Sequence, residues 1–113
     1  MNVENVISLK AVGDILPFRS LKMTANGVDY AGAADKVIGW SLPGDLNRNY
    51  PSVQIHGRFI EATCGSATAI AAGDEIEQAA NGKYVKKNAG AAVGVAVTDG
   101  GNDGERFDAI IYA

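Results

Sequence analysis

The second half of the chain repeats features of the first half at a separation of 55 residues. With this shift, Ala25-Asn26-Gly27 falls on Ala80-Asn81-Gly82 and Gly39 falls on Gly94. Apolar residues keep the same spacing, because Ile38, Trp40 and Leu42 fall on Val93, Val95 and Val97. A true repeat predicts two similar β-hairpin units packed into one barrel or sandwich. A chance match of a Gly- and Ala-rich chain with itself is the competing explanation.

Apolar residues recur at every second position in several segments, which is typical of half-buried strands. Residues 53–62 are predicted to form one antiparallel strand, with Val53, Ile55 and Phe59 on one face. Residues 38–42 and 93–97 are expected to place their bulky side chains inward and their small ones outward. The last segment, 106–112, alternates in the same way, with Phe107, Ala109 and Ile111 inward.

Turn residues separate these strands. Asn26-Gly27 and Asn81-Gly82 suit tight hairpins because both residue types tolerate positive φ, and residues 99–104 form a longer tip before the last strand. The expected fold is all-β, a compact small barrel or sandwich with little helix. Residues 1–12 are assigned to an N-terminal arm, either disordered or adding a strand to another chain, and residues 13–113 to a single β-barrel domain.

Composition removes several classes of function. The 113 residues include 10 basic and 13 acidic ones, and no basic cluster exceeds Lys86-Lys87, so nucleic-acid binding is not expected. The longest stretch without charged or strongly polar residues, 89–97, is too short to cross a bilayer. The N-terminus lacks the pattern of a secretory signal, and we expect synthesis in the cytoplasm without membrane association.

The chain offers little for catalysis or metal binding. Cys64 and His56 are the only residues of their types, which argues against an intramolecular disulfide and a zinc cluster. Nothing in the sequence pairs His56 with a nucleophile, and Cys64 is interpreted as a small, partly buried apolar residue. The acidic segment 99–105 fits a solvated hairpin tip better than a calcium loop. We therefore predict no enzymatic activity and no cofactor.

The C-terminal half resembles small head decoration proteins of tailed bacteriophages, also called capsid cement proteins. The resemblance covers residues 53–113 and is carried by 71–76 (Ala-Ala-Gly-Asp-Glu-Ile), 80–84 (Ala-Asn-Gly-Lys-Tyr) and 91–97 (Ala-Ala-Val-Gly-Val-Ala-Val). It implies a β-tulip barrel that forms a homotrimer at three-fold and quasi-three-fold positions of an icosahedral capsid. Such a protein binds the major capsid protein on the outer surface of the virion and stabilises the shell after expansion.

Seven residues are candidates for contacts with the capsid or between subunits. Four lie in the arm, where members of such families commonly reach the capsid, and three lie on expected strands, where Trp40 is also a candidate for the core. The candidates are Val3, Val6, Ile7, Leu9, Trp40, His56 and Arg58.

Two other functions stay open. A barrel-sandwich carrier module presents a modified lysine at a hairpin tip, and Lys83, Lys86 and Lys87 follow the Asn81-Gly82 turn. A module that binds a small ligand or a sugar needs an exposed aromatic platform, for which Tyr30 and Tyr50 are the candidates.

Overall fold

The computed structural model describes residues 6–43, 49–55, 57–66 and 69–112. Within these ranges the chain forms two five-stranded antiparallel sheets and one short 3-10 helix, η2 (Ala80–Gly82). The all-β prediction with little helix is confirmed. In the same ranges, no helix is long and apolar enough to span a membrane.

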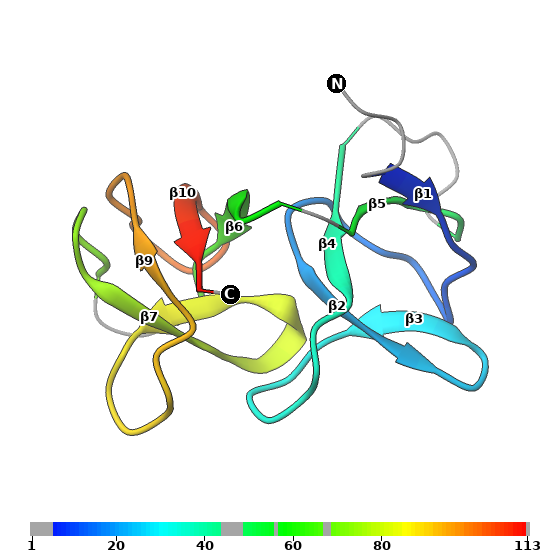
Figure 1. The fold of residues 1–113 in the computed structure, drawn as a ribbon, viewed down its shortest axis with the longest axis horizontal. Helices are drawn as coiled ribbons and strands as arrows, with labels where there is room; N and C mark the ends of the chain where they lie inside the picture. The colour runs from blue at the N-terminus through cyan, green and yellow to red at the C-terminus, as the bar shows by residue number, and fades with distance from the viewer. Residues whose placement is uncertain (1–5, 44–48, 56, 67–68, 113) are drawn as a thin grey trace.

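The first sheet belongs to the N-terminal half and the second sheet to the C-terminal half, and we call the halves lobe A and lobe B (Figure 1). The strands of lobe A are β1 (Val6–Ser8), β2 (Ser20–Thr24), β3 (Gly27–Tyr30), β4 (Gly39–Ser41) and β5 (Ser52–Gln54). Those of lobe B are β6 (Phe59–Thr63), β7 (Glu75–Gln78), β8 (Tyr84–Lys86), β9 (Gly94–Ala96) and β10 (Arg106–Ile111).

The two sheets have the same topology. Their strand orders are β1-β5-β4-β2-β3 and β6-β10-β9-β7-β8, so each strand of lobe A has a counterpart in lobe B. An isolated parallel bridge also recurs, joining Ala11 to Val28 in lobe A and Cys64 to Tyr84 in lobe B. The internal repeat is therefore real at the level of structure, and β4 and β9 keep the 55-residue separation seen in the sequence.

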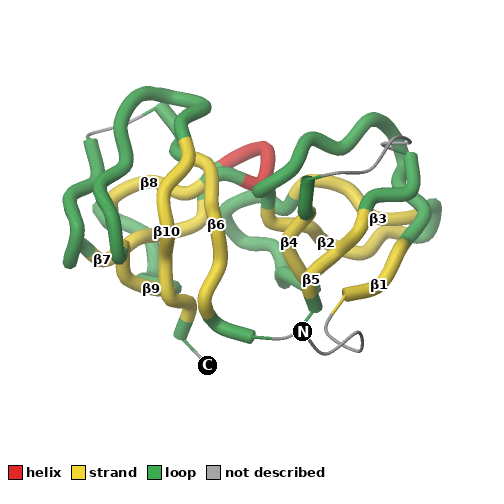
Figure 2. Tube along the Cα trace, turned by 90° about the horizontal axis from the view of Figure 1, so that it is seen from above, coloured by secondary structure: helices red, strands yellow, loops and turns green. Residues whose placement is uncertain are grey.

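Each lobe buries its own hydrophobic cluster, and the two lobes lie side by side (Figure 2). In lobe A the buried members are Ala11, Ile15, Leu21, Val28 and Val53. In lobe B they are Ile60, Ala62, Cys64, Ile70, Ile76, Tyr84, Ala96, Phe107 and Ala109. Each repeat unit thus supplies a sheet and a core of its own, and the lobes meet at a separate contact.

The prediction of one continuous strand over 53–62 is wrong. The segment divides into β5 and β6, which belong to different sheets, and Gly57 adopts a φ of 92° between them. This conformation suits glycine and interrupts the alternation of side chains. Val53 is fully buried in lobe A, whereas Phe59 is 57% exposed on lobe B.

Ile38 and Val93 pack against the clusters of their own lobes as expected, but within β4 and β9 the expected faces are reversed. Gly39 and Ser41, like Gly94 and Ala96, point to the core of their own lobe, and the bulky residues between them point away. A Cβ on Gly39 would lie 2.6 Å from the carbonyl oxygen of Gln54, and a Cβ on Gly94 would collide with that of Ile110. Small residues face inward because the neighbouring strand is packed too closely for larger ones.

The remaining turn and strand predictions are confirmed. Residues 25–26 join β2 to β3, and Asn81 and Gly82 both have positive φ in the turn between β7 and β8. Residues 99–104 connect β9 to β10. In β10, Phe107 and Ala109 are buried as expected, and the partly buried Ile111 packs against the cluster of lobe B.

Candidate interaction surfaces

Three of the predicted arm residues belong to lobe A. Val6 and Ile7 lie in β1, which pairs with β5 at the sheet edge, and Ile7 is exposed. Leu9 packs against the cluster of lobe A. Val3 and His56 lie outside the described residues. The described part of the arm is therefore an edge strand whose partner strand, β5, is in the same chain.

Trp40 links the two lobes. It lies in β4 of lobe A but packs against the hydrophobic cluster of lobe B, and its indole Nε1 donates a hydrogen bond of 2.9 Å to the phenol oxygen of Tyr84. Tyr84 is fully buried, and this burial raises the pKa of its phenol, an effect that the bond from Trp40 opposes. Trp40 thus contributes to the contact between halves of one chain.

The turn between β7 and β8 lies against lobe A. The Gly82 backbone N–H donates to the carbonyl of Ala31 at 2.8 Å, and a Cβ on Gly82 would lie 2.6 Å from the carbonyl oxygen of Ser20. The Gln78 side-chain amide donates to the carbonyls of Gly32 and Asp35. The end of this hairpin therefore docks on lobe A through backbone groups as well as side chains.

The loop before β2 makes a second tie between the lobes. Phe18 has a φ of 63°, which is unusual for a bulky residue, and its carbonyl accepts a buried 2.8 Å bond from the Thr63 hydroxyl. The guanidinium of Arg106 lies 4.8 Å from the centre of the Phe18 ring. The Phe18 backbone N–H donates to Ser41. These contacts hold Phe18 in its left-handed conformation at the lobe contact.

Arg58 lies apart from the other candidates. Arg58 directly precedes β6 and makes two hydrogen bonds with Ile111. Its Nε donates to the Ile111 carbonyl, and its own carbonyl accepts from the Ile111 backbone N–H. Among the described candidates, only Val6 and Trp40 share a row, because both pair with Gln54 on the same face of the sheet. The predicted residues do not form one surface.

Lobe B carries an exposed apolar row that the sequence did not single out. Phe59, Ile110 and Val95 pair across β6, β10 and β9, so their side chains lie on one face of the sheet. Phe59 is 57% exposed, Ile110 is 36% exposed and Val95 is half-buried. The signal was the alternation of β10 itself, which places Ile110 opposite to Phe107 and Ala109. We call this side of the sheet the outer face of lobe B.

Acidic side chains flank this row. Glu75 pairs with Val95 at the next strand, and its carboxylate accepts a 3.1 Å bond from the Tyr112 hydroxyl. Glu61 and Asp108 pair with each other in the next row on the same face, two residues along β6 and β10. The Glu61 carboxylate lies 3.8 Å from the Arg106 guanidinium. The outer face of lobe B combines an apolar centre with a largely acidic margin, as interaction surfaces often combine an apolar core with a polar rim.

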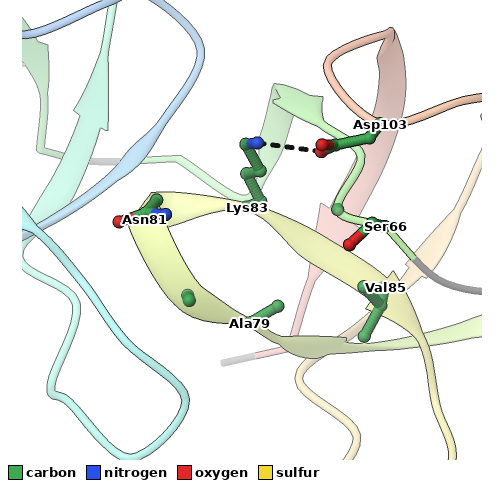
Figure 3. A pocket seen from close by; sticks show the side chains of 8 residues that line it. Ser66, Ala79, Asn81, Lys83, Val85 and Asp103 are labelled. Carbon is green, nitrogen blue, oxygen red and sulfur yellow. Dashed lines mark hydrogen bonds and ion pairs between the residues drawn. The ribbon is translucent and has the colours of Figure 1, made fainter.

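A hollow of about 290 Å³ lies beside the turn between β7 and β8 (Figure 3). Its lining includes Ser66, Ala79 and Val85, and the Lys83 ammonium forms a 2.8 Å ion pair with Asp103 above it. The carrier alternative requires a lysine that extends freely from the hairpin tip. The ammonium group of Lys83 is instead engaged in this ion pair.

The described residues contain no group of three or more side chains of the types that bind metal ions. Cys64 is fully buried, and burial raises the pKa of its thiol. This environment disfavours the thiolate that nucleophilic chemistry requires. The expected apolar role of Cys64 agrees with its place in the core of lobe B.

Comparison with solved structures finds a likeness that extends over nearly the whole chain. No family model and no curated protein matches the chain. A crystal structure described as the head fiber gp8.5 N base in bacteriophage phi29 superposes with a TM-score of 0.66, at 16% sequence identity. The match covers 95% of this chain and 92% of that one. The two chains share a fold. The similarity includes both lobes, because it extends over nearly the whole chain.

Proposed function

We propose that this protein is a structural component of a tailed-phage virion, attached to the outer surface of the head. The observation that carries the proposal is the fold shared with a phage head fibre base along 95% of the chain. The resemblance of residues 71–97 to capsid decoration proteins supports the same location from sequence. The burial of Cys64 agrees with its expected role as a small apolar residue.

In this proposal the protein binds the major capsid protein as a homotrimer at three-fold and quasi-three-fold positions and stabilises the expanded shell. Small subunits gain from such assembly, since a short chain buries a limited core of its own. Three linked copies also strengthen weak individual contacts through effective concentration. The exposed apolar row on lobe B offers a surface for contacts between subunits.

The shell-facing surface is proposed to be the arm, residues 1–12, with β1 at its centre. β1 is the edge strand of its sheet, and edge strands have backbone groups that can pair with another chain. Ile7 is 39% exposed on this strand and provides an apolar contact.

Cosedimentation with phage heads tests the proposal. Purified protein is mixed with unexpanded and with expanded heads of the phage that encodes it, produced without the protein. We expect saturable binding to expanded heads, and greater resistance of the decorated heads to heat or chelator. Absence of the protein from purified virions, measured by mass spectrometry, together with no binding to either head form, overturns the proposed function.

The role of β1 is tested with Ile7→Lys. We expect weaker head binding, by tenfold or more, without a change in the far-ultraviolet circular dichroism spectrum. Leu16→Lys is the matched control, because Leu16 is exposed to a similar extent on lobe A but lies outside residues 1–12. Equal head binding by the two variants would contradict a role for β1 at the shell.

A further inference from the structure

The contact between the lobes joins two different surfaces. One is the end of the β7–β8 hairpin, where Gln78 and η2 project. The other is the outer face of lobe A, where Ser20 and Trp40 lie in one row with Gln54. Gln54 takes part as well, because its side-chain amide donates to the Phe59 carbonyl of lobe B. The contact is therefore head-to-tail between two similar units.

The repeat places a second copy of each surface at the free ends of the molecule. Strand pairing identifies the counterparts in lobe B: Glu75 matches Ser20, Val95 matches Trp40 and Ile110 matches Gln54. The backbone agrees, because the Lys87 N–H donates to the Glu75 carbonyl just as the Ala31 N–H donates to the Ser20 carbonyl. The outer face of lobe B thus has the framework of a surface that lobe A uses for docking.

The free hairpin end is that of β2 and β3 in lobe A. Met23 of β2 matches Gln78 of β7, because Met23 pairs with Val28 where Gln78 pairs with Tyr84. The turn at residues 25–26 matches the turn that contains η2. In Figure 1, this turn and β9 lie on opposite sides of the molecule. The turn at residues 25–26 and β9 therefore do not meet within one chain.

At one position on each free surface, an apolar side chain stands where the lobe contact has a half-buried glutamine. Ile110 stands in place of Gln54, and Met23, 53% exposed, stands in place of Gln78. The glutamines are satisfied by carbonyl groups across the lobe contact. These two side chains would leave water if the contact that joins the lobes were repeated between copies, and removal of apolar surface from water favours association.

We propose that the end of the β2–β3 hairpin of one copy docks on the outer face of lobe B of a second copy, repeating the contact that joins the lobes. A contact between two different surfaces is heterologous, and it produces a closed ring when the rotation between copies allows. Closure after three copies gives the homotrimer of the proposed function, on which this inference rests and whose subunit surfaces it names.

The test uses one variant on each surface, Ile110→Lys on the outer face and Met23→Lys at the hairpin end. Light scattering is expected to give three times the chain mass of 11.7 kDa for the unmodified protein and the mass of a monomer for each variant. Phe59→Lys is a second variant of the outer face, in case Ile110→Lys does not fold. Tyr50→Lys, an exposed position outside both surfaces, is the control and is expected to remain trimeric.

Mixing the two variants separates this contact from any other. The Ile110→Lys chain keeps an intact hairpin end and the Met23→Lys chain keeps an intact outer face, so an equimolar mixture can form one contact. We expect a heterodimer by sedimentation velocity, with no larger species, whereas neither variant forms dimers alone.

Three results would overturn the inference: a monomeric unmodified protein at millimolar concentration, trimers of either folded variant, or a mixture that stays monomeric. Head binding, measured separately by cosedimentation, reports on the proposed function. Head binding without heterodimer formation would refute only the subunit contact. Heterodimer formation without head binding would refute only the capsid role.

Discussion

The indole N–H of Trp40 in lobe A donates a 2.9 Å hydrogen bond to the hydroxyl of Tyr84 in lobe B. Trp40 comes from the first repeat unit and Tyr84 from the second, and the ring of Trp40 packs on the cluster that contains Tyr84. One pair therefore combines apolar burial with a directional bond across the lobe contact. We therefore expect the stability of each lobe to depend on the other through this contact.

Replacing either member of the pair is expected to destabilise the protein. Tyr84→Phe removes one buried hydrogen bond and is expected to cost about 1 kcal/mol, and Trp40→Phe, which leaves the Tyr84 hydroxyl without that donor, about 1–3 kcal/mol. Urea unfolding of both single variants and of the double variant measures the coupling. Strictly additive effects would contradict an energetic link between the two residues.

Gly39→Ala and Gly94→Ala are expected to destabilise the protein by similar amounts, about 1–3 kcal/mol each. In both cases the new Cβ meets a carbonyl oxygen of the adjacent strand, that of Gln54 or that of Ile110. Gly13→Ala is the control, because a Cβ there has no neighbour within 4 Å. Thermal unfolding of the three variants checks the expectation, and equal melting temperatures for all three would refute it.

Stability is expected to fall at alkaline pH because of Tyr84. Burial raises its pKa above the ordinary value of 10.0, so the unfolded chain releases this proton before the folded one does. The stability that the buried, protonated Tyr84 contributes is fully present below pH 10.0, and it is lost as the pH rises through the higher pKa of the folded state. Urea unfolding between pH 8 and about pH 11 is expected to show a steeper decline for the unmodified protein than for Tyr84→Phe. Parallel curves would contradict this assignment.

The Cys64 thiol is expected to react slowly with a disulfide reagent in the folded protein and rapidly in urea. It is buried, and burial raises its pKa, so both access and the thiolate fraction are reduced. A Cys64→Ala variant carrying Val97→Cys, at an exposed position, is the matched control and is expected to react rapidly when folded. Equal rates for the two folded proteins would show that Cys64 is accessible.

Much of the secondary structure was readable from sequence because its signals are local. Asn26-Gly27 and Asn81-Gly82 predicted their turns because these residues tolerate positive φ. The alternation of Phe107 and Ala109 predicted the buried face of β10. The 55-residue spacing between Gly39 and Gly94 was one sign of the repeat. In the structure, each of these glycines lies where the carbonyl oxygen of a neighbouring strand leaves no room for a Cβ.

Other features depended on distant parts of the chain. β5 ends at Gln54 and β6 begins at Phe59, and Gly57 between them adopts a positive φ where the chain passes from one sheet to the other. The pattern of 53–62 did not reveal this break. The bulky side of β4 faces away from its own core because a second lobe is available to cover Trp40. A period of two fixes which side chains share a face, but not which face is buried.

The sequence by itself predicted an all-β chain and its main turns, and it left open whether the 55-residue repeat reflects two similar units or a chance match. Only the tertiary structure decided that each unit has its own core, that Trp40 joins the units and that Phe59 and Ile110 remain exposed. The physical reason is that local conformation follows from neighbouring residues, whereas the choice between two faces of a strand depends on what packs against each face.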